Sequence, residues 1–386
     1  MSYLLIKNAR AVFENNIKSV DILLKGNLIE DTDFSGELPQ DCMIIDAQNN
    51  YVSPGFIDIH VHGGGGYDFM DCTKEAFKEI SRTHLLNGTT TLLPTAVSSE
   101  FDDILKLIKT YKEVGSDCQN FCGIHLEGPY ISKNQKGAHK EYLLHSPTEY
   151  ETAILLSEGK GVIKRITAAP ELDNMENFAQ KMIELGVVMS LGHSDATSDI
   201  ASKAFGYGFS HVTHLYSATP SVRKINQVVK AGVIEAAYLN DAVSVEMIAD
   251  GKHAAVDALK LAVKIKGTGK VVLVSDALRP SGTSVKESYL GEIKEENRVI
   301  IEDGVAKLPD RSSFAGSIAT TQMLLERAVN HYGFSIIEAV KMMTSSPADV
   351  LRLHDRGRLR PGAKADIVIF SSEFKIKDVI LNGNIV

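Results

Sequence analysis

The sequence predicts an α/β protein: a (β/α)8 TIM-like barrel with a small β-sandwich domain formed by both chain termini. Three observations predict this fold. The middle of the chain alternates apolar strand-like runs with segments of helical spacing, and eight such units can close into a barrel. Both chain ends contain only short strand-like runs. The 386 residues, 44% hydrophobic and 23% charged, have an ordinary globular balance and enough length for a barrel and a smaller domain.

The chain ends share one pattern of short apolar runs bounded by Asn, Lys and Gly turn signals. Neither end is long enough to bury a hydrophobic core alone. We therefore expect the two ends to pair into one domain, residues 1–53 plus 357–386, with residues 54–356 inserted as the barrel. The runs lie at 4–6, 21–24, 43–45, 365–370 and 379–381.

Eight strand candidates fall in the middle of the chain, with helix-like segments between most of them. One predicted helix covers residues 74–86 and ends before Gly88. Residues 279–316 interrupt the alternation of strand-like and helix-like segments and predict a long loop with a hairpin after the last strand. Long loops that follow barrel strands commonly contribute to an active site. The strand candidates are 57–61, 89–93, 123–127, 165–169, 187–191, 210–214, 243–248 and 270–275.

Charge and composition narrow the partners and the compartment. A net charge of −8 predicts a surface that repels nucleic acid and anionic membranes. No apolar run approaches the ~18–20 residues that span a bilayer, and no signal peptide is recognisable. Four cysteines form no Cys-x-x-Cys pair, which favours reduced thiols in a cytoplasmic protein.

The segment 56–62 carries two histidines on one face of an extended strand. Strict alternation places Asp58, His60 and His62 toward the barrel interior, while Ile57, Ile59 and Val61 face the surrounding helices. Two imidazoles two residues apart can reach one metal ion. A merely polar barrel interior is the alternative reading of this pair.

Four further candidates also lie at strand ends: Glu127, His193, His214 and Asp276. Each alone has a structural explanation, such as a salt bridge, a buried core histidine or a turn-capping aspartate. Successive parallel strands that end in such residues at one height are much harder to obtain by chance. Histidine and carboxylate suit zinc, iron(II), cobalt or manganese, so the sequence predicts a divalent-metal site that activates water for hydrolysis.

Neighbouring residues refine this expectation. His125 shares the face of Glu127 and is expected behind the ligands, whereas odd spacing from His214 predicts that His211 faces outward. No lysine ends the 165–169 strand, since Arg165 lies at its opposite end, so Glu127 is the expected bridge between two ions. The run 63–66 of four glycines is not followed by Gly-Lys-Ser/Thr and is no nucleotide-binding loop. We expect it to pass close to metal or substrate, with a flexible loop as the alternative.

Together these motifs resemble the N-acetylglucosamine-6-phosphate deacetylases, a family of the amidohydrolase superfamily. The match covers nearly the whole chain in the right order. The segments that carry it are 54–63, 125–130, 136–139, 192–194, 213–216, 249–253, 274–277, 315–317, 347–348 and 357–366.

The resemblance implies removal of acetate from N-acetyl-D-glucosamine 6-phosphate, with one or two divalent ions per subunit. Asp276 would take a proton from the metal-activated water and return it to the leaving amine, and His253 would stabilise the oxyanion. The implied metal residues are His60, His62, Glu127, His193, His214 and Asp276. The implied substrate residues are Ala138, His139, Ser217, Ala218, Arg223, His253, Phe314, Ala315 and Gly316.

Two positions depart from the family pattern. Ser217 stands where many members carry Asn, and it cannot supply an amide's hydrogen-bond pattern. The phosphate element is reduced to 223–226, where the guanidinium fork of Arg223 suits phosphate. In the family this arginine reaches the neighbouring subunit's site, which implies a homodimer.

Two other functions stay open. The chain could be another amidohydrolase that acts on a related N-acyl sugar or a cyclic amide, although the missing strand-end lysine argues against most cyclic amidases. It could also be an inactive barrel used as a scaffold, although such proteins typically lose ligands and this chain keeps every candidate ligand.

Overall fold

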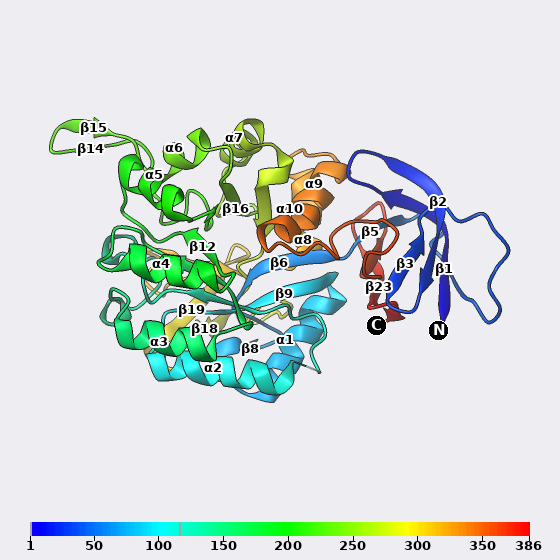
Figure 1. The fold of residues 1–386 in the computed structure, drawn as a ribbon, viewed down its shortest axis with the longest axis horizontal. Helices are drawn as coiled ribbons and strands as arrows, with labels where there is room; N and C mark the ends of the chain where they lie inside the picture. Colours follow the sequence, from blue (N-terminus) through cyan, green and yellow to red (C-terminus); the bar gives the residue numbers. More distant parts are fainter. Residues whose placement is uncertain (1, 116) are drawn as a thin grey trace.

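The computed structural model describes residues 2–115 and 117–386 and confirms the predicted fold class (Figure 1). Eight parallel strands pair in the order β17-β16-β13-β12-β11-β10-β9-β6. The bridge between Val61 and Ala277 brings the two end strands together at their carboxyl ends, so the barrel is nearly closed. The strands are β6 (Phe56–Val61), β9 (Thr89–Ala96), β10 (Ile124–Glu127), β11 (Ile163–Ala168), β12 (Val188–Leu191), β13 (His211–Val212), β16 (Ser244–Ile248) and β17 (Val271–Val274).

All eight predicted barrel strands are present, with shifted ends. β9 continues three residues beyond the predicted range, to Ala96, whereas β13 contains only His211 and Val212. The outward prediction for Ile57 and Ile59 is confirmed, because both pack in one cluster with Ala348.

Helices cover the outside of the barrel (Figure 1). The first, α1 (Lys74–Leu86), has the predicted bounds: the Thr73 side chain accepts a hydrogen bond from the Ala76 backbone at its start, and Gly88, at φ 94°, follows its end. The others are α2 (Phe101–Val114), α3 (Glu149–Glu158), α4 (Met175–Glu184), α5 (Ser198–Tyr207), α6 (Val233–Leu239), α7 (Val256–Lys266), α8 (Thr321–Asn330), α9 (Ile336–Met343) and α10 (Ser345–Val350).

Both chain ends form one mixed sheet beside the barrel, at the right of Figure 1. Antiparallel pairing of Val52 with Ile369 joins the N-terminal and C-terminal strands, and a separate apolar cluster that includes Ile6 and Ile22 forms the core. The division at residues 53/54 and 356/357 stays a prediction. The strands are β1 (Tyr3–Val12), β2 (Ile17–Lys25), β3 (Leu28–Asp31), β4 (Met43–Asp46), β5 (Tyr51–Pro54), β22 (Ile367–Phe370), β23 (Ile376–Leu381) and β24 (Asn384–Ile385).

Three smaller sheets are formed by the segments that connect the barrel strands and helices. β14 (Arg223–Ile225) and β15 (Val228–Lys230) form a hairpin that projects from the molecule at the upper left of Figure 1. The predicted hairpin within 279–316 is present, inside a larger four-stranded antiparallel sheet. That sheet contains β18 (Glu287–Tyr289), β19 (Arg298–Glu302), β20 (Val305–Lys307) and β21 (Phe314–Ser317); β7 (Gly63–Gly64) and β8 (Tyr67–Asp68) form the third pair.

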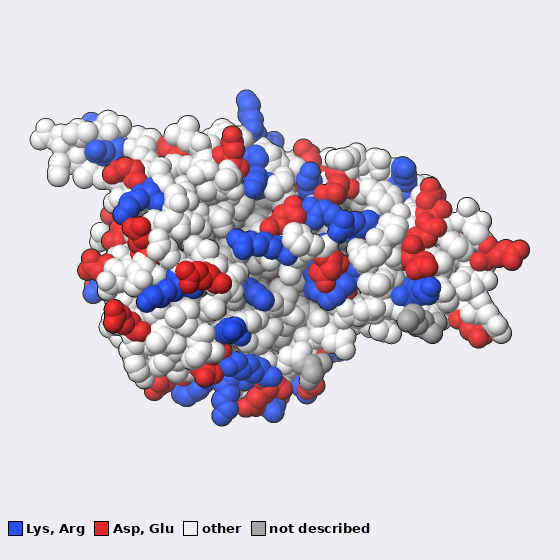
Figure 2. Space-filling view, in the orientation of Figure 1, with Lys and Arg blue, Asp and Glu red and all other residues white. Residues whose placement is uncertain are grey.

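The surface carries both charge signs. On the face drawn in Figure 2, Lys and Arg are interspersed with Asp and Glu rather than gathered in one patch. Within the described residues, every helix is too short or too polar to cross a bilayer.

Candidate metal centre and its cavity

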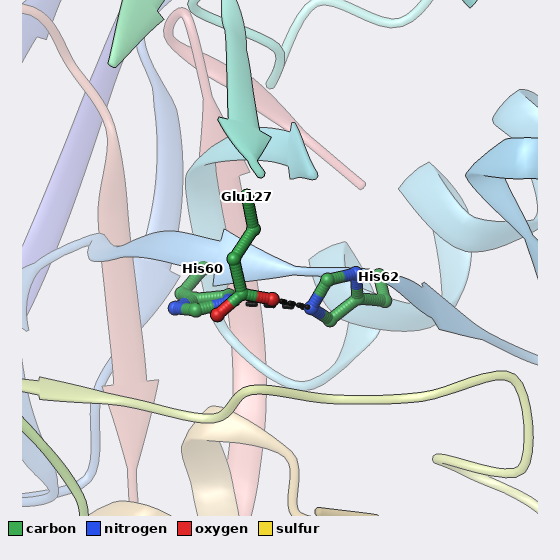
Figure 3. Close-up of side chains that lie close together, drawn as sticks. All are labelled: His60, His62 and Glu127. Atoms are coloured by element: carbon green, nitrogen blue, oxygen red, sulfur yellow. Dashed lines mark hydrogen bonds and ion pairs between the residues drawn. The ribbon is translucent and has the colours of Figure 1, made fainter. Parts of the chain in front are cut away.

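The carboxyl ends of the barrel strands bring the six predicted metal residues together. His60 lies on β6, His62 follows it, and Glu127 is the last residue of β10. Figure 3 shows the rings of His60 and His62 on either side of the Glu127 carboxylate. The two Nε2 atoms are 3.2 Å apart, and His62 Nε2 is 3.1 Å from Glu127 Oε2.

Glu127 is the centre of the cluster. Its Oε1 lies 3.2 Å from His193 Nε2 and 2.9 Å from His214 Nε2. Asp276 Oδ1 lies 3.4 Å from His62 Nε2 and 3.5 Å from His60 Nε2. Because both Glu127 oxygens face imidazoles, this carboxylate can contribute to two adjacent cation positions.

The hydrogen-bonding pattern of the cluster fits a cation. The Nδ1 atoms of three rings face groups that can only accept a hydrogen bond: His60 faces Glu246 Oε1 at 2.8 Å, His193 faces the Gln135 carbonyl at 2.7 Å, and His214 faces the Ser217 carbonyl at 3.0 Å. Each Nδ1 therefore carries a proton, and Nε2 is the ring atom left to face a carboxylate oxygen, which offers only lone pairs. Such an arrangement requires protons or a metal ion between the atoms.

The electrostatics agree with this reading. Burial opposes a charge on His62, but Asp276 and Glu127 outweigh it and raise the pKa of His62 to about 9. Burial likewise opposes the charge on Glu127, yet His60 and hydrogen bonds from neighbouring histidines hold its pKa well below the usual range. Without metal, protons therefore occupy the space between the ligands, and a divalent cation would displace them.

The backbone at three of these positions is strained. His193, His214 and Asp276 follow their strands with φ of 47°, 25° and 49°. Non-glycine residues rarely adopt this left-handed region, and such strain clusters at functional sites. These turns aim the side chains inward over the barrel.

The barrel interior below the cluster overturns one prediction. His211 does not face outward: its Nδ1 is 2.7 Å from Ser244 Oγ, and its ring lies inside the barrel. The alternation failed because β13 ends at Val212 and the backbone then leaves the extended conformation at His214. Arg165 sits at the far end of β11, as predicted, but its fully buried guanidinium reaches Glu246 at 2.6 Å.

Glu246 is the residue that the sequence reasoning missed. Its signal was the alternation in β16, where Ser244, Glu246 and Ile248 share one face. His125 lies behind the ligands as predicted, with its ring edge-on to His60 at 4.7 Å between centroids.

A cavity of about 220 Å³ opens above the cluster. His60 lies beneath its floor, and Arg223 lies outside its lining. The cavity is lined by His62, Val97, Glu127, Gly137, Ala138, His139, His193, His214, Ser217, Ala218, Ile248, His253, Asp276, Leu290, Ser313, Phe314, Ala315 and Gly316. All other predicted substrate residues are therefore in the lining.

Two polar side chains of the wall have defined orientations. His253 Nδ1 lies 2.8 Å from Asp250 Oδ2, and its ring packs 4.8 Å from that of Phe314. His139 Nδ1 lies 2.7 Å from Ser98 Oγ, and burial lowers the pKa of His139 to about 4, so the ring is neutral. His139 Nε2 lies 3.5 Å from Glu127 Oε2, so this ring also borders the cluster, and Glu127, His139 and His193 together form a group that could hold an ion.

The glycine run has a different role from the one expected. A side chain at Gly63 would collide with the backbone of Tyr67 and Arg279, and one at Gly64 would collide with His84. The close approach is therefore to neighbouring protein segments rather than to metal or substrate.

Arg223 lies on the projecting hairpin. Its guanidinium binds Asp195, with Nη1 2.9 Å from Oδ1 and Nη2 donating to the Asp195 carbonyl at 2.6 Å. This arginine therefore binds a neighbouring loop and does not line the cavity.

Comparisons with known proteins agree with this geometry. The profile of the amidohydrolase family matches residues 51–386. N-acetylglucosamine-6-phosphate deacetylase of Bacillus subtilis (strain 168) is 32% identical over 99% of this chain and 96% of the relative. The enzyme of that name from Haemophilus influenzae is 29% identical over 99% of both chains. N-acetylgalactosamine-6-phosphate deacetylase of Shewanella sp. (strain ANA-3) is 29% identical over 86% of this chain and 82% of the relative.

Solved structures show the same likeness. N-acetylglucosamine-6-phosphate deacetylase from Pasteurella multocida superposes with a TM-score of 0.92 at 27% identity, over 100% of this chain and 99% of the other. A mutant of the Mycobacterium smegmatis enzyme in complex with N-acetyl-D-glucosamine-6-phosphate gives a TM-score of 0.91 at 27% identity over the same shares. The family match spans most of the chain, and the chain belongs to the amidohydrolase family.

Proposed function

We propose that this chain is a metal-dependent hydrolase that removes acetate from N-acetyl-D-glucosamine 6-phosphate to give glucosamine 6-phosphate in amino-sugar catabolism. One observation carries the reaction class: the imidazole Nε2 atoms of His60, His62, His193 and His214 converge on the carboxylate of Glu127 at the floor of a cavity. The names of the full-length relatives support the substrate.

The proposed metal ligands form two overlapping groups that share Glu127. One contains His60 and His62, and the other contains His193 and His214. Asp276 borders the first group. A divalent ion held here, whether zinc, iron(II), cobalt or manganese, supplies the Lewis acidity that activates water and polarises an amide carbonyl.

The proton path in this proposal belongs to Asp276. Burial opposes its charge, but His60 and His62 lower the pKa of Asp276, so the carboxylate is ionised and ready to accept a proton. It takes the proton of the attacking water and later delivers it to the nitrogen of the leaving amine. Asp276 lines the cavity, so it can contact an acetamido group bound there.

His253 is the proposed oxyanion donor. Its Nδ1 proton is directed to the buried Asp250 carboxylate, so Nε2 can donate only when the ring is the imidazolium. His139, Ala138, Ser217, Ala218 and the segment 314–316 then surround the sugar.

The phosphate contact in this proposal comes from a second subunit. The projecting hairpin exposes Val222, Val228 and Val229 by 54%, 56% and 62%, a surface that a homodimer would cover. In such a dimer, Arg223 would leave Asp195 or share it and bind the phosphate of the partner's substrate. The proposed location is the cytoplasm, where sugar phosphates are retained.

Acetate release tests the proposal. Metal-loaded protein is assayed with N-acetylglucosamine 6-phosphate, the same sugar without phosphate, and N-acetylgalactosamine 6-phosphate. The proposal predicts the highest kcat/KM for the first substrate. Preference for the galactosamine compound would transfer the assignment to the activity named for the Shewanella relative, which is the second candidate. Metal binding with no acetate release from any of them would contradict the deacetylase proposal.

A further inference from the structure

We propose that Glu246, which lies inside the barrel below the cavity, is a positioning residue that aligns both ligand groups of the candidate metal centre. The inference rests on the proposed metal-dependent function but not on the identity of the substrate. Glu246 sits in the middle of β16, is fully buried, and does not line the cavity. It therefore acts only through the residues that it touches.

One oxygen of Glu246 connects the two ligand groups. Its Oε1 accepts from His60 Nδ1 at 2.8 Å and from the backbone N–H of His214 at 3.1 Å. His60 belongs to one group and His214 to the other. A single carboxylate oxygen thus links a ring on β6 to the turn that follows β13.

The contact with His60 fixes the form of its ring. A carboxylate can only accept, so the proton stays on Nδ1 and the lone pair of Nε2 points toward His62 and Glu127. The contact with His214 acts on the backbone, because it holds the amide of a residue whose φ is 25°.

The other oxygen of Glu246 holds it in place. Arg165 Nη1 lies 2.6 Å from Oε2, and His211 Nε2 lies 3.4 Å from it. The guanidinium is itself fixed by Ser190 Oγ and Thr213 Oγ1, each at 2.8 Å, and by the Ile59 carbonyl at 3.1 Å. The ion pair therefore ties together five of the eight barrel strands or their ends.

A structural role alone does not account for this arrangement. A fully buried ion pair is often no more stabilising than apolar residues of the same volume, because both charges lose their hydration. The orientation of two proposed metal ligands by one anchored carboxylate is a function that an apolar replacement could not perform. Partners of this kind typically change metal affinity by about 10- to 100-fold when they are removed.

The test compares Glu246→Gln with His211→Asn. Glu246→Gln is isosteric, whereas His211→Asn replaces the ring by a smaller amide. Both alter the same buried network, but the described hydrogen-bond contacts of the His211 ring go to Ser244 Oγ and Glu246 Oε2 rather than to a proposed ligand. The affinity of each protein for Zn²⁺ is measured by competition with a chelating dye, and its unfolding midpoint is measured without metal.

We expect Glu246→Gln to weaken Zn²⁺ binding about 10- to 100-fold, while His211→Asn stays within about threefold of the unmodified protein. Equal Zn²⁺ affinities for Glu246→Gln and the unmodified protein would overturn the inference. So would equal losses in both variants, since that result describes a general effect of the network. Activity of the unmodified protein on the sugar phosphate is scored separately, so failure of the deacetylase proposal leaves this comparison intact.

If Glu246→Gln does not fold, Glu246→Asp replaces it in the measurement of Zn²⁺ affinity. It keeps a charge opposite Arg165 but is one methylene too short to span both His60 and Arg165. We expect at least a tenfold loss of Zn²⁺ affinity, and an unchanged affinity would overturn the inference.

Discussion

Asp276→Asn is the substitution that most cleanly separates catalysis from metal binding. The amide has the same shape as the carboxylate, so the strained turn at φ 49° and the packing of a residue only 8% exposed are kept. What it removes is the proton acceptor. Loss of a general acid–base typically lowers turnover by about 10²- to 10⁴-fold, which raises the barrier by about 3–5 kcal/mol.

The structure predicts that most of the metal remains. Glu127 and the four histidines keep their donor atoms, and Asp276 contributes only contacts of 3.4 and 3.5 Å at the border of one group. The assay is initial-rate acetate release together with elemental analysis of the same sample. Asp366→Asn is the matched control, because Asp366 is a buried carboxylate of the small β-domain that accepts from the Asn382 backbone.

Three outcomes would count against this reasoning. Turnover within tenfold of the unmodified protein would mean that Asp276 does not carry the proton. Loss of metal in proportion to activity would mean that Asp276 acts mainly as a ligand. A similar loss of turnover in Asp366→Asn would point to a general effect of removing buried carboxylates.

Three further predictions concern residues around the centre. Asp250→Asn should lower kcat about 10- to 100-fold with unchanged metal content, since the ring of His253 loses the carboxylate that accepts from its Nδ1 and holds its orientation; unchanged kinetics would remove His253 from the oxyanion role. Arg223→Ala should raise KM for the phosphorylated sugar by about 10- to 100-fold but not for the unphosphorylated one, which matches a charge-assisted bond of about 1.5–3 kcal/mol; equal effects on both substrates would contradict phosphate binding. Burial lowers the pKa of His84 to about 4. As pH falls from 6.5 toward 4, the unfolded chain therefore takes up a proton at His84 that the folded chain excludes. This difference lowers the free energy of unfolding by up to about 3 kcal/mol. Denaturant titrations should show that the stability difference between His84→Gln and the unmodified protein changes over that pH window; a difference constant with pH would exclude the effect.

The strand-end residues could be predicted from sequence because parallel strands in a barrel end at one face. His60, His62 and Glu127 need only the register of their own strands to converge. The alternation along β6 was sufficient to predict that His60 and His62 share one face of the strand. It also placed Ile57 and Ile59 correctly against the helices.

The buried network of Arg165, His211 and Glu246 could not be predicted from the sequence, for a different reason. The inward position of His211 depends on where β13 stops, and the strand ends after two residues although the apolar pattern continues. Arg165 and Glu246 meet across the barrel, and no local pattern reports a contact between residues 81 positions apart.

The sheet formed by β18–β21 was only partly predictable. Its strands are short, and the 314–317 strand is half-exposed and rich in small residues, so it lacks the apolar alternation of a buried strand. Its place over the centre follows from the bridge between Ala277 and Ser317, a tertiary contact.

A crystal structure of protein prepared without chelator, with anomalous diffraction recorded at the absorption edges of zinc, iron, cobalt and manganese, tests the central claim directly. We predict an anomalous peak about 2.0–2.2 Å from a Glu127 oxygen and from the Nε2 atoms of His193 and His214. Density for water alone at this position, with the rings joined to Glu127 by ordinary hydrogen bonds, would contradict the account.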